Sequence, residues 1–205
     1  MKRPTPQTQE AKILRLAGKR GLLRARDTHN LGIPTTVLTR LVRNGKLERV
    51  SRGIYTLPGA QMSAQRSLAE VSLRTPRGVI CLLSALRLHD IGTQAPFEVW
   101  LALPPGVTAR QMDGPSIRII RMSGQSLTKG VEKMSIDGVA VPVFCAAKTV
   151  ADCFKFRNKI GLDVALEALR ETHRARKASI DEIWRYAVIN RVGNVMRPYM
   201  EALTA

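Results

Sequence analysis

Short apolar stripes, separated by turn-forming residues, organise the first sixty residues of the chain. Their spacing predicts three helices, expected to begin at Thr8 or Gln9, at Ala25 and at Pro34, and to end near Gly18, at Leu31 and at Arg43. Gly32 stands where a left-handed C-cap is needed after the second helix, and Asn44-Gly45 stops the third. This segment is therefore expected to be mainly helical.

The third helix is predicted to be amphipathic. Leu38, Leu41 and Val42 fall at i, i+3 and i+4 and can bury one face. The opposite face carries only hydroxyl and cationic side chains, namely Thr35, Thr36, Thr39, Arg40 and Arg43. Because a cationic face without acids repels itself unless an anion compensates it, this face favours a polyanionic partner.

A hairpin is predicted directly after the third helix, with strands at Lys46–Val50 and Ile54–Leu57. The tight turn between them consists of Ser51, Arg52 and Gly53. Three helices followed by a hairpin is the order of a winged helix-turn-helix. In that fold the third helix enters the major groove of DNA, and the hairpin touches phosphates or the minor groove.

The rest of the chain combines helical and strand patterns. Helices are expected at 63–74, 79–91, 146–157, 161–173 and 179–189, with a short piece after Pro198, and strands at 97–103, 116–122, 131–136 and 139–144. Asp137-Gly138 is a strong two-residue hairpin signal, and Ser179 with Glu182 forms a capping-box pattern. We therefore expect an α+β protein with two domains. Residues 1–60 would form the winged helix, and residues 61–205 a small, mainly antiparallel sheet flanked by helices.

The charge of the chain indicates a function for this predicted fold. The chain has a net charge of +17, and residues 1–60 hold 13 bases against 3 acids. Most of these bases are arginines, which suit bidentate contacts to phosphate and guanine. We expect the DNA-binding residues to be Thr35, Thr36, Thr39, Arg40, Arg43, Lys46, Arg49, Ser51 and Arg52. The alternative is a protein-interaction module whose arginines are merely solvated.

Other features indicate a soluble protein of the cytoplasm. The sequence has neither a secretory signal pattern nor an apolar run long enough to span a membrane. The three cysteines stand far apart in apolar surroundings, which favours reduced, buried thiols over a disulfide framework or a zinc site. No cofactor or metal is expected.

Catalytic motifs are weak. Phosphate-binding glycine loops, HExxH and GxSxG do not occur in the sequence, and Ser84 is poorly spaced for a nucleophile paired with His89. Asp90 and Glu98 resemble the start of a metal-dependent nuclease site, but Trp100 stands where a lysine is wanted. The chain is thus expected not to be an enzyme. The alternative is a metal-dependent nucleic-acid-processing enzyme with a winged-helix targeting domain.

Three stretches, in order, resemble the AbiEi family of antitoxins and transcriptional regulators from type IV toxin–antitoxin (abortive infection) systems. They are LERVSRGIYTLP (47–58), VICLLSALRLHDIGTQAPFEVWLALP (79–104) and VPVFCAAKTVADCFKFRNKIGLDVALEALR (141–170). The resemblance implies a bacterial, nucleoid-associated repressor that binds its own promoter through the winged helix, with antitoxicity in the second domain. It also implies a nucleotidyltransferase-like toxin as functional partner, without a stable complex. A solitary regulator without a toxin would have the same features.

Overall fold

The computed structural model describes residues 6–61, 63–109 and 114–204, and divides the chain into two compact units. The first unit comprises Met1–Arg74, Arg110–Pro115 and Met134–Val141, and the second comprises Thr75–Ala109, Ser116–Lys133 and Pro142–Ala205. The division predicted at residue 60 stays a prediction. Each unit is described by itself.

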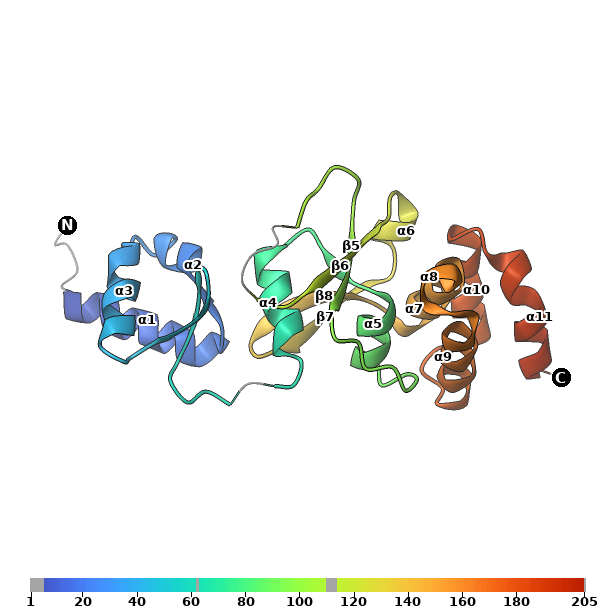
Figure 1. Cartoon of the computed structure of the whole chain (residues 1–205), viewed down its shortest axis with the longest axis horizontal. Coiled ribbons are helices and arrows are strands. Elements are labelled where there is room, and N and C mark those ends of the chain that lie inside the picture. The colour runs from blue at the N-terminus through green and yellow to red at the C-terminus, as the bar shows by residue number, and fades with distance from the viewer. Residues whose placement is uncertain (1–5, 62, 110–113, 205) are drawn as a thin grey trace. The chain divides into compact units, whose positions relative to one another are not determined.

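The first unit begins with three helices and a small sheet (Figure 1). In chain order the elements are α1 (Pro6–Arg20), β1 (Leu23–Arg24), α2 (Ala25–His29), α3 (Thr35–Arg43), β2 (Glu48–Ser51) and β3 (Ile54–Thr56). Strands β1, β3 and β2 lie in that order in an antiparallel sheet, and α4 (Arg66–Arg74) follows. The three expected helices and the hairpin are present, whereas β1 was not predicted because two residues give no periodicity.

The core of this region explains why α3 forms where it does. Val37, Leu38 and Leu41 are buried against Ile13 of α1 and other apolar side chains. Pro34 precedes the helix in an extended conformation, and the helix ends before Gly45, whose φ of +66° suits glycine. The apolar stripe therefore fixes which face of α3 points outward.

The second unit contains most of a five-stranded sheet in the order β6-β5-β4-β8-β7. Its strands are β4 (Val79–Ile80), β5 (Val99–Leu103), β6 (Ile117–Arg121), β7 (Val131–Ile136) and β8 (Val139–Phe144). The hairpin predicted at Asp137-Gly138 is present between β7 and β8, and both residues have the positive φ that a type I′ turn needs.

The sheet is mixed, so the expectation of a mainly antiparallel sheet was wrong. Strand β4 pairs antiparallel with β5 but parallel with β8, and β5 pairs parallel with β6. Parallel neighbours need a connection of about a dozen residues or more, and the chain between β5 and β6 is that long. Strand direction depends on this pairing, which the apolar pattern of a single strand does not encode.

The predicted helix 79–91 is also corrected. Val79 and Ile80 form the buried strand β4, and only α5 (Leu82–Leu88) is helical. A continuous apolar run carries no periodicity that separates a buried strand from a buried helix. Gly78 permits the strand because a Cβ there would lie only 2.8 Å from the side chain of Leu101 on β5.

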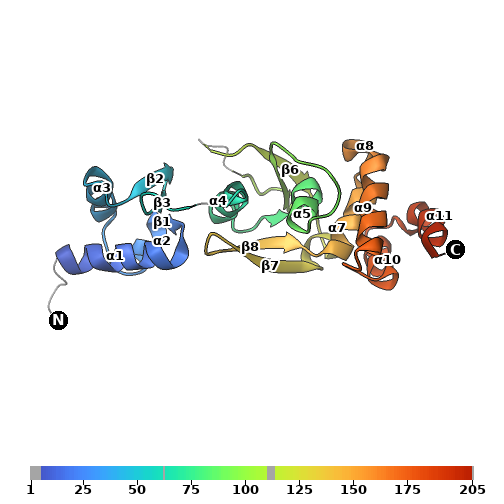
Figure 2. The same cartoon turned by 90° about the horizontal axis from the view of Figure 1, so that it is seen from below.

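Helices make up the rest of the second unit (Figure 2). They are α6 (Gln125–Thr128), α7 (Ala146–Lys155), α8 (Arg157–Ile160), α9 (Leu162–Arg174), α10 (Ile180–Ile189) and α11 (Gly193–Thr204), and α7 packs against α5, α9 and α10. The capping box of α10 is present, with Ser179 and Glu182 bonded reciprocally. The helix expected to begin after Pro198 instead runs through it, because Met196 and Met200 bury one face of α11.

A buried polar network joins three of these helices. The Nζ of Lys148 lies 2.5 and 2.6 Å from the two carboxylate oxygens of Asp152, and both side chains are fully buried. Asn190 donates from Nδ2 to Asp152 Oδ1 at 2.7 Å and accepts from Ser126 Oγ at 2.9 Å. Burial raises the pKa of Asp152, although Lys148 and Asn190 act against that rise. The network therefore fixes α7, α6 and the end of α10 to one another.

Candidate nucleic-acid interface

The outward face of α3 carries the side chains that the sequence predicted. Thr35, Thr36, Thr39, Arg40 and Arg43 are all exposed, and we call them the α3 face. The alternation arises because Val37, Leu38 and Leu41 occupy the buried side of the same helix. The face contains hydroxyl and guanidinium groups only, which can donate hydrogen bonds to phosphate oxygens and to base acceptors.

One member of this face already has a protein partner. The Nε of Arg40 donates to Glu10 Oε1 on α1 at 2.8 Å, and the Nζ of Lys46 lies 3.5 Å from Glu10 Oε2. Glu10 is largely buried, whereas both cations remain about half exposed. Arg40 and Lys46 can therefore reach a phosphate or a base only by sharing or leaving this carboxylate. Glu10 was missed because residues thirty positions apart show no local signal.

Arg43 and Arg52 are in a different situation. Both are exposed, and neither forms a hydrogen bond or ion pair with another described residue. Arg43 is the last residue of α3, and Arg52 lies in the turn between β2 and β3. Within the described part of the chain, their guanidinium groups are the cations of the predicted set that no protein group holds.

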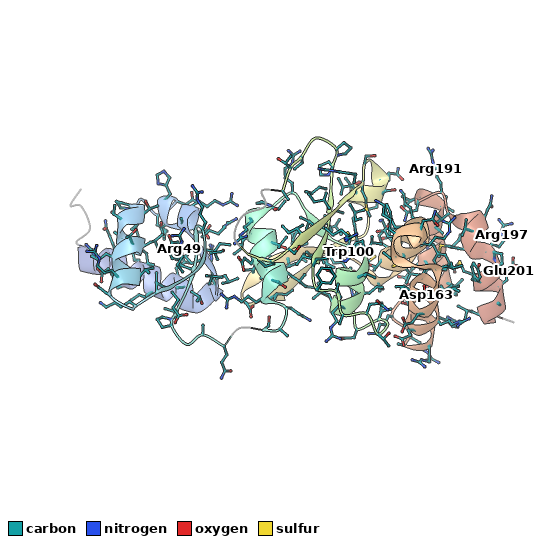
Figure 3. All side chains as sticks on the ribbon, in the orientation of Figure 1. Arg49, Trp100, Asp163, Arg191, Arg197 and Glu201 are labelled. Carbon is teal, nitrogen blue, oxygen red and sulfur yellow. The ribbon has the colours of Figure 1, made fainter. Side chains whose placement is uncertain are left out.

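The other two hairpin residues differ from each other. Arg49 is exposed on β2, and its Nε donates to the backbone oxygen of Ser51 at 3.4 Å (Figure 3). Ser51 is buried, with 9% of its surface exposed, and its hydroxyl has no hydrogen-bond partner in the described part of the chain. The pairing of β2 with β3 shifts between these residues, as at a β-bulge, which re-aims side chains. Arg49 thus belongs to the exposed cationic surface and Ser51 lies beneath it.

A second carboxylate holds two more arginines of this unit. Asp27 is buried and accepts hydrogen bonds from the backbone and the guanidinium of Arg24, and Arg20 lies 3.5 Å away. Burial alone would raise the pKa of Asp27, but the bonds from Arg24 and the charges of both arginines bring it below its usual value. Arg20 and Arg24 therefore serve the start of α2 rather than the free cationic surface.

The alternative nuclease residues are not brought together into a metal site. Glu98 forms an ion pair with Arg118, whose guanidinium also lies over the ring of Trp100. Among the described residues no group of three or more His, Cys, Asp or Glu side chains could hold a metal ion. Ser84 Oγ accepts a hydrogen bond from the backbone of Trp100, and His89 Nε2 bonds the backbone oxygen of Phe144 at 2.7 Å. These polar groups therefore have structural partners.

Comparison with known proteins supports the N-terminal assignment. A family model described as transcriptional regulator, AbiEi antitoxin, matches residues 11–58, which confirms the resemblance for the segment from α1 to the end of the hairpin. No curated protein sequence matches the chain. The crystal structure of the RV2827C protein from Mycobacterium tuberculosis is similar in fold. It has a TM-score of 0.51 and 14% identity, over 98% of this chain and 81% of that one. No helix among the described residues is long and apolar enough to cross a membrane.

Proposed function

We propose that the protein is a sequence-specific DNA-binding repressor, and that its first sixty residues act as a winged helix-turn-helix. The observation that carries this proposal is the acid-free α3 face, followed by a hairpin with exposed Arg49 and Arg52, inside the segment that matches the AbiEi regulators. In a winged helix the third helix enters the major groove, and the hairpin lies along the backbone. That docking would bring Arg43 to base edges and Arg52 to phosphates.

We also propose that the protein serves as the antitoxin of a type IV toxin–antitoxin system and represses its own promoter in the bacterial cytoplasm. The match to AbiEi antitoxins supports this role. The functional partner would be a nucleotidyltransferase-like toxin, neutralised without a stable complex, and residues 61–205 would carry the antitoxicity. A solitary regulator is the second candidate, and the presence of an adjacent toxin gene separates the two.

Fluorescence anisotropy with a labelled duplex from upstream of the gene tests DNA binding. The full-length protein should bind this duplex more tightly than a scrambled duplex of equal length. The double variant Arg43→Ala/Arg52→Ala should lose most of that affinity. Arg87→Ala, which removes an exposed arginine from α5 of the second unit, is the matched control. Equal affinity for both duplexes, or an equal loss in the control, would contradict the proposal.

Growth rescue tests the antitoxin role in the full chain. Co-expression with the neighbouring toxin should restore growth, and Arg43→Ala/Arg52→Ala should retain rescue when transcribed from an unrelated promoter. If the double variant keeps its fold but loses rescue, antitoxicity depends on DNA binding. The proposed assignment of the two functions to different parts of the chain would then be wrong.

A further inference from the structure

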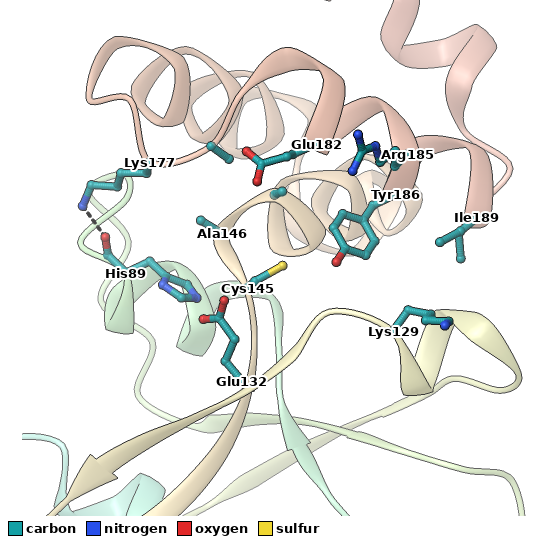
Figure 4. A pocket seen from close by; sticks show the side chains of 12 residues that line it. His89, Lys129, Glu132, Cys145, Ala146, Lys177, Glu182, Arg185, Tyr186 and Ile189 are labelled. Carbon is teal, nitrogen blue, oxygen red and sulfur yellow. Dashed lines mark hydrogen bonds between the residues drawn. The ribbon is translucent and has the colours of Figure 1, made fainter.

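A cavity in the second unit is lined by charged and polar side chains that the proposed DNA-binding role does not use. It has a volume of about 820 Å³, within the range of small-molecule sites. Lys177 stands on one side of it, Lys129 and Arg185 on the other, and Cys145 and Tyr186 lie between them (Figure 4). We call it the Cys145 cavity.

Positive charge dominates around this cavity. A second hollow of about 750 Å³ shares Lys177, Ala178 and Glu182 with it and adds Arg174 and Arg176. Five cationic side chains thus line the two hollows, against the carboxylates of Glu132 and Glu182, and Arg174 among them forms an ion pair with Glu171. An excess of cations in a recess attracts ligands that carry more than one negative charge.

The fixed partners of these groups leave several cations available. Glu182 accepts from the backbone and hydroxyl of Ser179, so its carboxylate is committed to the capping box of α10. Lys177 donates to the backbone oxygens of His89 and Asp90. Lys129 and Arg185 form no ion pair with another described residue.

Neutral donors complete the lining. Tyr186 is partly buried, and burial, the neighbouring Cys145 thiol and the nearby acids raise its pKa to about 12. Its phenol therefore stays protonated and can donate to an anion at neutral pH. The small side chains of Ala146 and Ala147 at the start of α7 also line the cavity.

From this arrangement we propose that the Cys145 cavity binds a small phosphorylated molecule with at least two negative charges. Lys177 would hold one anionic end, Lys129 and Arg185 the other, and the Tyr186 hydroxyl would lie between them. The recessed volume favours a small molecule over the phosphate backbone of a nucleic acid. The site lies entirely within the second unit and is independent of the proposed DNA contacts.

Cys145 provides a local reporter. It is the partly exposed member of the three cysteines, whereas Cys81 and Cys153 are buried, so a thiol reagent should modify Cys145 first in the folded protein. Inorganic pyrophosphate and ADP should each be tested for slowing of this modification and for direct binding by calorimetry. At least one should do both, and in Cys145→Ser the corresponding thiol reaction should be absent.

Variants of the lining residues test whether the probe binds in the Cys145 cavity. Lys129→Gln and Arg185→Gln should each weaken binding about tenfold, since each removes a charged hydrogen-bond donor. Lys159→Gln and Arg170→Gln remove exposed cations of the same unit that line neither hollow, and should leave binding unchanged. The proposal is wrong if neither probe binds, if the controls weaken binding equally, or if only an oligonucleotide protects Cys145.

Discussion

The buried ion pair of α7 allows a quantitative prediction for Lys148→Met. This substitution keeps an apolar stem of similar length but removes the ammonium that lies 2.5 and 2.6 Å from the two Asp152 oxygens. Asp152 is fully buried and, among the described residues, would retain only Asn190 as a side-chain hydrogen-bond donor. Breaking a buried pair on one side typically costs about 3–5 kcal/mol, because the remaining charge is uncompensated. We therefore expect a loss of about 3 kcal/mol or more in the free energy of unfolding of the second unit.

The same variant should show a defined pH dependence. Burial raises the pKa of Asp152, and removal of Lys148 removes an interaction that opposes this rise. The folded variant then binds a proton more readily than the unfolded chain does. The contribution of Asp152 to the free energy of unfolding is fully present below the carboxyl pKa of the unfolded chain. It is lost as the pH rises through the higher pKa that Asp152 has in the folded variant. The difference in the free energy of unfolding between Lys148→Met and the wild type should therefore be smaller at pH 5 than at pH 8.

Tryptophan fluorescence during urea denaturation measures the loss in the free energy of unfolding of the second unit. The two tryptophans of the chain, Trp100 and Trp184, both belong to the second unit. Lys159→Met removes an exposed lysine on α8 and should change the unfolding free energy by less than about 0.5 kcal/mol. A loss below about 1 kcal/mol in Lys148→Met, or a difference that grows as the pH falls, would refute the reasoning.

Three further predictions concern the candidate DNA interface. Arg43→Ala should weaken operator binding by about 1–3 kcal/mol and relax the preference at one base position, as measured by anisotropy with a set of single-base operator variants. Arg52→Ala should instead weaken all sequences nearly equally and reduce the slope of log K against log salt by about one unit; an altered sequence preference with an unchanged slope would argue against a phosphate contact. Glu10→Gln should release Arg40 and Lys46, raise the affinity for DNA of any sequence and steepen the salt dependence. Glu48→Gln, which removes an exposed acid of the same unit, is its matched control, and an equal gain there would show that net charge alone is responsible.

Local pattern predicted the elements whose faces differ in polarity. The α3 helix, the β7–β8 hairpin and the capped α10 helix all lie where the sequence placed them, because each combines an apolar stripe with specific turn or cap residues. The prediction of one helix over 79–91 failed because the segment is nearly all apolar, and its strand β4 is defined by neighbours on β5 and β8. The prediction that the last helix begins after Pro198 was wrong for a related reason. The packing of Met196 and Met200 stabilises a helix that continues through the proline, and that packing is not visible in local propensity.

Ion pairing explains what a count of charges in the sequence could not tell about the candidate site. A count of bases in residues 1–60 treats all thirteen alike, but Glu10 holds Arg40 and Lys46, and Asp27 holds Arg20 and Arg24.

Such pairing changes the energy of a DNA contact. An arginine already bonded to a carboxylate gains less from a phosphate than a solvated one does, because it must share or lose its first partner. The α3 face and the hairpin should therefore not contribute evenly. Substitution of Arg43 or Arg52 should weaken DNA binding more than substitution of Arg40, and that order should reverse or vanish in a Glu10→Gln background, where Arg40 becomes free.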